Sequence, residues 1–157
     1  MPEATKPRIA VIGLGSMGYG MATSLRRSGF EVTGCDVSAE AVKRFVGEGG
    51  NGAGTPAEAA KSADIVVSVV VNAAQTETIL FGANGVAETL AKDAVFISSA
   101  TMDPDVARRL AKQLEASGRQ VRRWTSLHHY FGGVSAIGRE GAAGDPRRSG
   151  EGLVLGS

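Results

Sequence analysis

The stretch RIAVIGLGSMG, residues 8–18, is a short apolar run that passes directly into three closely spaced glycines. A short apolar run that ends in glycine is typical of a buried parallel strand, which we place at residues 8–12. Apolar and small residues then recur at helical spacing over residues 16–28, and Gly29 is positioned to end that helix. The stretch therefore predicts a strand, a tight glycine turn and a helix.

The alternation of apolar runs and helical patterns continues to about residue 120. Further strands are expected at residues 31–35, 64–71 and 94–98, and helices at 39–46, from 55 onward, at 74–80, briefly from 85, and at 103–117. Ser38 is positioned to cap one of these helices, and the sequence Thr55-Pro56-Ala57-Glu58 is a capping box with proline at the first helical position. Strands separated by helices predict an α/β fold with a Rossmann-type, doubly wound parallel sheet, which we assign to residues 1–121.

The glycines of the first turn form the pattern GxGxxG, and Asp36 follows the next expected strand. In this context Gly13 permits a tight turn, Gly15 lets a pyrophosphate approach the backbone, and Gly18 lets the helix pack close to the strand. Phosphates would lie at the helix N-terminus, and Asp36 would accept hydrogen bonds from the adenosine ribose. Because a carboxylate repels a 2′-phosphate, NAD is favoured over NADP. The alternative is that the glycines only form a turn and Asp36 only caps a strand end.

The composition favours one small domain without a nucleic-acid or membrane partner. The 157 residues carry a net charge of +1, too little for a nucleic-acid surface, and no apolar run approaches the roughly 20 residues of a membrane span. The first residues hold no apolar signal segment, and Cys35, the single cysteine, excludes an intrachain disulfide. Both observations favour the cytoplasm. His128 and His129 are adjacent and cannot face one site, so we expect no metal.

Three longer blocks resemble one enzyme family. They are VIGLGSMGYGMATSL (residues 11–25), VVVNAAQTETILFGANGVAETL (69–90) and FISSATMDP (96–104). They are similar to the 3-hydroxyisobutyrate or β-hydroxyacid dehydrogenase family, relatives of 6-phosphogluconate dehydrogenase, and the middle block is most like the L-threonate dehydrogenase branch. The resemblance covers about residues 8–120. It implies an NAD-dependent oxidoreductase that transfers a hydride between NAD and a small hydroxy acid, and it implies a homo-oligomer.

The resemblance also implies which residues hold the cofactor. The implied cofactor-binding residues are Gly13, Leu14, Gly15, Ser16, Met17 and Gly18 at the pyrophosphate, Asp36 at the adenosine ribose, Val71 and Asn72 on the adenosine and nicotinamide-ribose side, and Thr101 beside the nicotinamide. Ala100 stands where the family has a serine, so one hydroxyl is missing. The residues alone leave other roles open: Val71 in the core, Asn72 as a helix cap, Thr101 as a turn cap, and Met17 with Met21 as helix core.

The resemblance ends where family members continue into a substrate-binding loop of the type DAPxSGG. Over residues 122–130 this sequence reads RRWTSLHHY instead, and the similar Phe131-Gly132-Gly133 comes a few residues late. The family's second, helical domain with its catalytic lysine has no counterpart here. We therefore expect the chain to hold only the dinucleotide-binding half and assign no catalytic residue. The alternative function is a non-catalytic NAD(P)-binding module.

The composition changes after about residue 119. Residues 119–157 contain six arginines and eight glycines but no lysine, and they offer little apolar surface to offset the entropy of ordering. We expect residues 122–157 to be an irregular tail, disordered or translated from a shifted reading frame.

Overall fold

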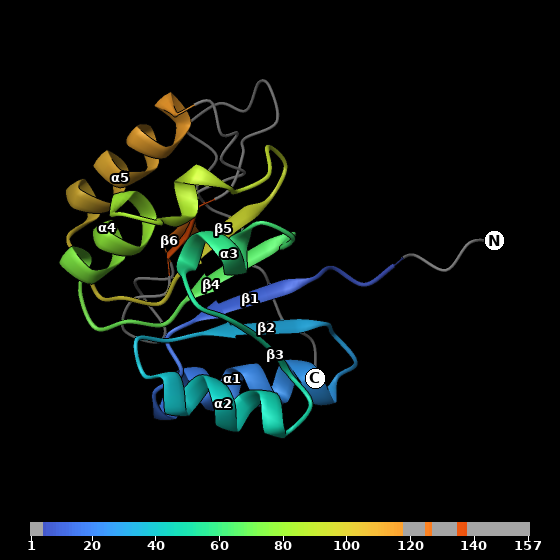
Figure 1. The fold of residues 1–157 in the computed structure, drawn as a ribbon. Coiled ribbons are helices and arrows are strands. Elements are labelled where there is room, and N and C mark those ends of the chain that lie inside the picture. Colours follow the sequence, from blue (N-terminus) through green and yellow to red (C-terminus); the bar gives the residue numbers. More distant parts are fainter. Residues whose placement is uncertain (1–4, 118–124, 127–134, 138–157) are drawn as a thin grey trace, which may run out of the picture.

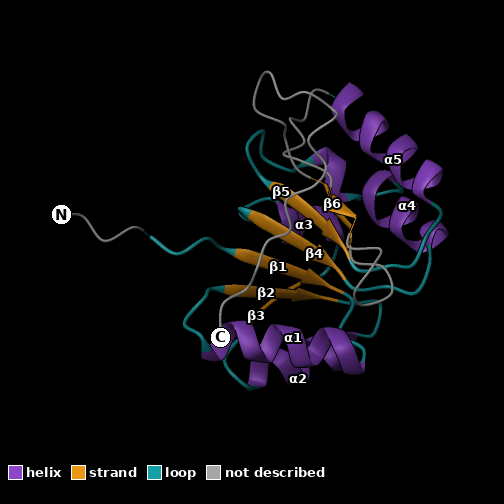
Figure 2. Ribbon diagram, turned by 180° about the vertical axis from the view of Figure 1, so that it is seen from behind, coloured by secondary structure: helices purple, strands orange, loops and turns teal. Residues whose placement is uncertain are grey.

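The computed structural model describes residues 5–117, 125–126 and 135–137. These residues form a sheet with helices on both of its faces (Figures 1 and 2). The strands are β1 (Ile9–Ile12), β2 (Val32–Cys35), β3 (Asn51–Ala53), β4 (Ile65–Ser68), β5 (Val95–Ser98), β6 (Thr125–Ser126) and β7 (Ser135–Ile137). The helices are α1 (Ser16–Arg27), α2 (Ala39–Gly47), α3 (Pro56–Ala60), α4 (Ala73–Phe81) and α5 (Pro104–Ala116), with a 3-10 turn η1 at Val86–Glu88.

The sheet follows the order β3-β2-β1-β4-β5-β7-β6 over the described residues, and its first five strands are parallel. β1 lies between β2 and β4, and all four of its residues are buried, which explains an apolar run without polar alternation. Ile12 is aligned with Cys35 on β2 and with Ser68 on β4. The three strands therefore end at the same edge of the sheet. The predicted doubly wound α/β fold is confirmed.

Each face of the sheet has its own apolar core. On one face α1 and α2 cover β1 and β2, with Val11, Val32 and Phe45 fully buried or nearly so. On the other face α3, α4 and α5 pack over β1, β4 and β5, around residues such as Phe96 and Leu110. No helix in the described part of the chain combines the length and apolar character that a membrane crossing needs.

The predicted helix caps are present. Ser38 Oγ accepts a hydrogen bond from the Ala41 amide at 3.3 Å, and Thr55 Oγ1 accepts one from the Glu58 amide at 3.2 Å. At the start of α5, Asp103 Oδ1 accepts from the Asp105 amide at 2.7 Å. Because capping oxygens satisfy amides that the helix itself leaves without acceptors, these positions begin α2, α3 and α5 where the sequence predicts.

Two strands differ from the prediction. β3 was not expected, because its Asn-Gly-Ala sequence has low β-propensity; pairing with β2 forms it. β4 was expected to run to Val71 but ends at Ser68, because its partners on both sides end at the same level, at Ile12 and Ser98. Residues 69–71 are therefore a loop at the sheet edge.

The predicted irregular tail, residues 122–157, lies mostly outside the described residues. The five tail residues that are described form the short antiparallel strands β6 and β7, and the rest of the predicted tail is not tested. β7 pairs with β5 from Phe96 to Ser98. An uncovered edge strand would leave backbone amides and carbonyls without partners, and this pairing satisfies them at β5.

Arg8 and Asp64 join the amino ends of β1 and β4. Asp64 Oδ2 accepts hydrogen bonds from the Arg8 backbone amide at 2.8 Å and from Arg8 Nε at 3.3 Å. Arg8 O in turn accepts from the Asp64 and Ile65 amides at 2.8 and 3.1 Å. The backbone hydrogen bond from Arg8, followed by the bond from its side chain, lowers the pKa of Asp64 below its ordinary value of 3.8.

We expect Asp64→Asn to lower the free energy of unfolding at neutral pH by less than about 1 kcal/mol, because both side chains are half exposed and water screens the pair. A carboxyl whose pKa is lower in the folded state stabilises the fold above its unfolded-state pKa, and this contribution is lost as the pH falls through the folded-state pKa. Urea unfolding of both proteins at about pH 7 and about pH 2.5 measures the difference. An equal difference at both pH values would contradict the assignment.

Candidate functional site

The glycine turn after β1 is held by close backbone packing. Gly13 has φ of +101°, and its amide donates to Cys35 O at 2.8 Å. A Cβ at Gly13 would lie 2.2 Å from Val69 O, and a Cβ at Gly18 would lie 1.8 Å from Gly13 O. The first and third glycines are therefore required by the fold itself, since no side chain fits at either position.

Gly15 differs from its two neighbours in the motif. A Cβ at Gly15 would meet no atom within 4 Å, and its φ of −65° suits any residue. Neither packing nor backbone conformation explains a glycine here. The open space in front of Gly15 is instead the point where two pockets meet.

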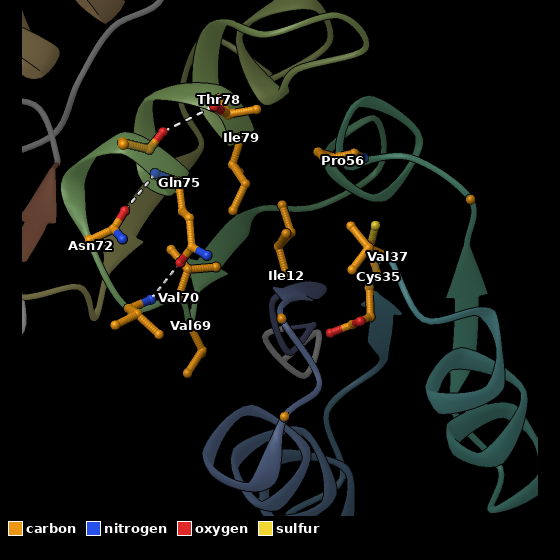
Figure 3. A pocket seen from close by; sticks show the side chains of 16 residues that line it. Ile12, Cys35, Val37, Pro56, Val69, Val70, Asn72, Gln75, Thr78 and Ile79 are labelled. Carbon is orange, nitrogen blue, oxygen red and sulfur yellow. Dashed lines mark hydrogen bonds between the residues drawn. The ribbon is translucent and has the colours of Figure 1, made fainter.

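The first pocket has a volume of about 590 Å³ and is called the Asp36 pocket below (Figure 3). Asp36 and Val37, which follow β2, line one side of it, and Gln75 and Ile79 from α4 line the other side. Its walls are mostly apolar. Such a pocket suits a flat apolar group that carries a few polar atoms.

The second pocket has a volume of about 450 Å³ and is called the Thr101 pocket below. Met17 on α1 and Ser99 and Thr101 after β5 line it. Both pockets include Gly15 and the loop 69–71. Two hollows that adjoin at a glycine turn suit a ligand of two bulky halves with a narrow linker at Gly15.

Asp36 is oriented by two backbone amides. Its Oδ2 accepts from the Leu14 amide at 2.6 Å, and its Oδ1 accepts from the Ser38 amide at 2.8 Å. A carboxylate can accept about four hydrogen bonds, so each oxygen keeps capacity for a ligand in the pocket. The bond from the Ser38 amide means that Asp36 also caps the end of β2, as the alternative interpretation expected. The carboxylate nevertheless lines the Asp36 pocket.

Among the cofactor-binding residues that the family resemblance implies, Leu14 alone lines neither pocket. Its side chain is 5% exposed and packs in the α1–α2 core, and its amide is bonded to Asp36. The amide of Leu14 therefore holds the carboxylate rather than facing the pocket. The motif GxGxxG gives no signal for this bond, because Asp36 lies 22 residues farther along the chain.

The loop 69–71 is fixed by the start of α4. Asn72 Oδ1 accepts from the Gln75 amide at 2.9 Å, which confirms the interpretation of Asn72 as a helix cap, and Asn72 also lines the Asp36 pocket. Gln75 Oε1 accepts from the Val71 amide at 2.9 Å (dashed lines in Figure 3). The side chain of Val71 is 78% exposed, so the reading that places it in the core is wrong. Sequence analysis missed Gln75, although Asn72-x-x-Gln75 is a capping-box spacing.

The Thr101 pocket gathers the remaining implied residues, Ser16, Met17, Gly18 and Thr101. Met17 is 70% exposed and lines the Thr101 pocket, so the expectation that it belongs to the helix core is wrong. Met21, one turn later, is partly buried against the core and also lines this pocket. Ala100, at the position of the family serine, is buried.

The described lining of both pockets is suited to binding rather than to proton transfer. Asp36 is its only carboxylate, and none of its residues is lysine or histidine. Burial, followed by the nearby charges of Asp36 and Glu58, raises the pKa of Cys35 to about 11, so this buried thiol stays protonated and unreactive. Among the described residues no cluster of three potential metal ligands occurs.

Residues 8–122 match the protein-family model described as the NAD binding domain of 6-phosphogluconate dehydrogenase. The L-threonate dehydrogenase of Cupriavidus necator is 46% identical over 110 residues, 70% of this chain and 37% of the relative. The 3-sulfolactaldehyde reductase of Escherichia coli is 40% identical with the same coverage. A crystal structure of 3-hydroxyisobutyrate dehydrogenase from Salmonella typhimurium matches with a TM-score of 0.67 and 34% identity, covering 71% of this chain and 39% of that chain. The chain spans little more than a third of the length of these relatives.

We expect alanine at two glycines of α1 to have opposite effects on stability. Gly18→Ala forces a methyl group against Gly13 O and should cost about 1–3 kcal/mol, as overpacking does. Gly20→Ala fills open space on the exposed side of the same helix and should stabilise the fold by up to about 1 kcal/mol through helix propensity. Urea unfolding compares both with the parent protein, and a neutral Gly18→Ala would show that the turn can relax.

Proposed function

Because the chain belongs to the family of the NAD-binding domain of 6-phosphogluconate dehydrogenase, we propose that it binds NAD across the Asp36 and Thr101 pockets. The observation that carries this proposal is the open Gly15 at the junction of the two pockets. NAD is two nucleotides joined by a pyrophosphate, so its narrowest part would pass over Gly15 while each nucleoside occupies one pocket. The linker carries two negative charges, which suit the N-terminus of a helix.

The N-terminus of α1 would hold the pyrophosphate. The first amides of a helix have no acceptor within it and carry the positive end of the helix dipole. The first turn of α1 contains no acidic residue that would oppose an anion. Gly13 and Gly18 would act indirectly, by keeping the turn compact, and Gly15 and Ser16 would face the phosphates.

Asp36 would bind the adenosine ribose and select NAD over NADP. Its oxygens are oriented by Leu14 and Ser38 and keep acceptor capacity for the 2′- and 3′-hydroxyls. A 2′-phosphate at this position would meet a carboxylate, and the next residue, the fully exposed Val37, offers no positive charge. Val71 and Asn72 would line the adenosine and nicotinamide-ribose side, and Thr101 in the second pocket would lie beside the nicotinamide.

We further propose that the complete catalytic unit is a β-hydroxyacid dehydrogenase, in which NAD accepts a hydride from the carbinol carbon of a small hydroxy acid such as L-threonate or 3-hydroxyisobutyrate. Relatives carrying these names support this substrate class. The lining of the two pockets supplies no lysine, so the general acid/base would come from a residue outside this lining. A homo-oligomer and a cytoplasmic location, the latter in keeping with the free thiol of Cys35, are part of the same proposal.

A second function, a non-catalytic NAD-binding module, is favoured by the same lack of a lysine or histidine in the described lining. The two functions are distinguished by absorbance at the NADH band after mixing the protein with NAD and L-threonate or 3-hydroxyisobutyrate. NADH formation supports the dehydrogenase, and NAD binding without turnover supports the module.

We expect isothermal titration to detect NAD binding that Gly15→Ala weakens at least about tenfold, equivalent to about 1.4 kcal/mol. The added methyl group would occupy the space proposed for the pyrophosphate but meets no protein atom, so the fold should be unchanged. Gly20→Ala, the same substitution in open space on α1, is the control and should bind NAD as the parent does. Equal binding by all three proteins would contradict the proposed position of the pyrophosphate.

Parallel titrations with NADP should give affinities at least about tenfold below those for NAD. Asp36→Asn should narrow this preference, because it removes the negative charge that faces the 2′-position. It should also cost about 1–3 kcal/mol of stability, since an asparagine amide has one acceptor oxygen for the two amides of Leu14 and Ser38. Tighter binding of NADP by the parent protein would overturn the role given to Asp36.

A further inference from the structure

Two helices that flank the Asp36 pocket begin with the same capping arrangement. At α3 the side chain of Thr55 accepts from the Glu58 amide, and Glu58 Oε2 accepts from the Gly54 amide at 2.8 Å. At α4 the side chain of Asn72 accepts from the Gln75 amide, and Gln75 Oε1 accepts from the amide of residue 71 at 2.9 Å. Glu58 and Gln75 thus occupy equivalent positions, and each holds the amide of the residue before the cap.

The two positions differ in what else they face. Gln75 lines the Asp36 pocket, whereas Glu58 lines neither pocket. For capping alone a carboxylate is at least as good as an amide, because its negative charge is favourable near a helix N-terminus and strengthens the hydrogen bond. Capping therefore explains glutamate at position 58 but does not explain why position 75 carries an uncharged amide.

The orientation of the Gln75 amide leaves its nitrogen, Nε2, available to a ligand. Since Oε1 accepts from the Val71 amide, Nε2 carries two N–H donors, and no hydrogen bond from Nε2 occurs among those of the described residues. In Figure 3 the side chain of Gln75 extends from α4 toward the loop 69–71, along the wall of the pocket that Ile12, Cys35 and Val37 border from the other side. The donor is thereby presented to the pocket, and its direction is fixed by the bond on the other atom of the same amide.

We propose that Gln75 is a further ligand-binding residue, whose Nε2 donates a hydrogen bond to an acceptor atom on the adenosine half of NAD. This inference rests on the proposed function, which gives the Asp36 pocket to that half. The adenine ring nitrogens and ribose oxygens are acceptors of the required kind. A glutamate at position 75 would keep the cap of α4 but would lack the donor and would add a negative charge beside an anionic ligand.

The reciprocal exchange of the two side chains tests this inference. Gln75→Glu keeps an acceptor for the Val71 amide, and Glu58→Gln keeps one for the Gly54 amide, so both variants should unfold at the temperature of the parent within about 3 °C. We expect Gln75→Glu to weaken binding of NAD and of AMP roughly 3–10-fold, the size of one lost hydrogen bond. Glu58→Gln should bind both ligands within about twofold of the parent.

Two further measurements separate a contact with the ligand from other effects. Nicotinamide mononucleotide, titrated by NMR chemical shifts, should bind Gln75→Glu and the parent equally, because it occupies the other pocket. The NAD and AMP titrations are repeated at about 0.5 M salt, where exposed charges are screened beyond a few ångströms. Most of the loss of affinity caused by Gln75→Glu should remain.

The outcomes distinguish this inference from the proposed function. If the parent protein does not bind NAD, the proposed function fails. If the parent binds NAD and Gln75→Glu binds it equally well, Gln75 makes no contact and the inference is overturned. Equal losses of affinity for AMP and nicotinamide mononucleotide would show that Gln75 only positions the loop 69–71. A loss that disappears at high salt would show that the added charge causes it. Either result would overturn the proposal that Gln75 Nε2 donates a hydrogen bond to the ligand.

Discussion

The site depends on the contact between the backbones of Gly13, Gly18 and Val69. With β1, β2 and β4 in register, the chain leaves all three strands at one level of the sheet, and the turn after β1 must pass within contact distance of the residue after β4. Substituents at Gly13 or Gly18 would overlap carbonyl oxygens of this contact. The tightness of the turn places α1 directly at the sheet edge, and the open position of Gly15 results from the same geometry.

Hydrogen bonds across the sheet edge convert this packing into an ordered site. Asp36 bonds the amide of Leu14 and thereby ties the glycine turn to the end of β2. Gln75 bonds the amide of Val71 and ties the loop after β4 to the first turn of α4. In both cases a side chain that lines the Asp36 pocket also holds a neighbouring segment of backbone. Binding groups that carry such structural bonds are oriented before a ligand arrives, which reduces the entropy lost on binding.

The features that sequence analysis predicted correctly are those with local causes. The strand at residues 8–12, the helix after the glycines and the caps at Ser38 and Thr55 follow from periodicity, glycine spacing and capping chemistry within a few residues. Features that depend on distant residues were missed or misplaced. β3 exists because β2 lies beside it, and β4 stops at Ser68 because its neighbours stop there. Met17 is exposed because it lines the Thr101 pocket, which forms only where α1 meets the segments after β4 and β5.

For this protein the sequence alone determined the fold class, the family resemblance and the acidic residue after the second strand, because periodicity and motif spacing are properties of adjacent residues. Only the tertiary structure decided that Leu14 faces Asp36 rather than a pocket, that Asn72 and Gln75 brace one loop, and that two pockets adjoin at Gly15. These arrangements join segments separated by tens of residues, and the hydrogen bonds and hollows exist only once the sheet brings those segments to a common edge.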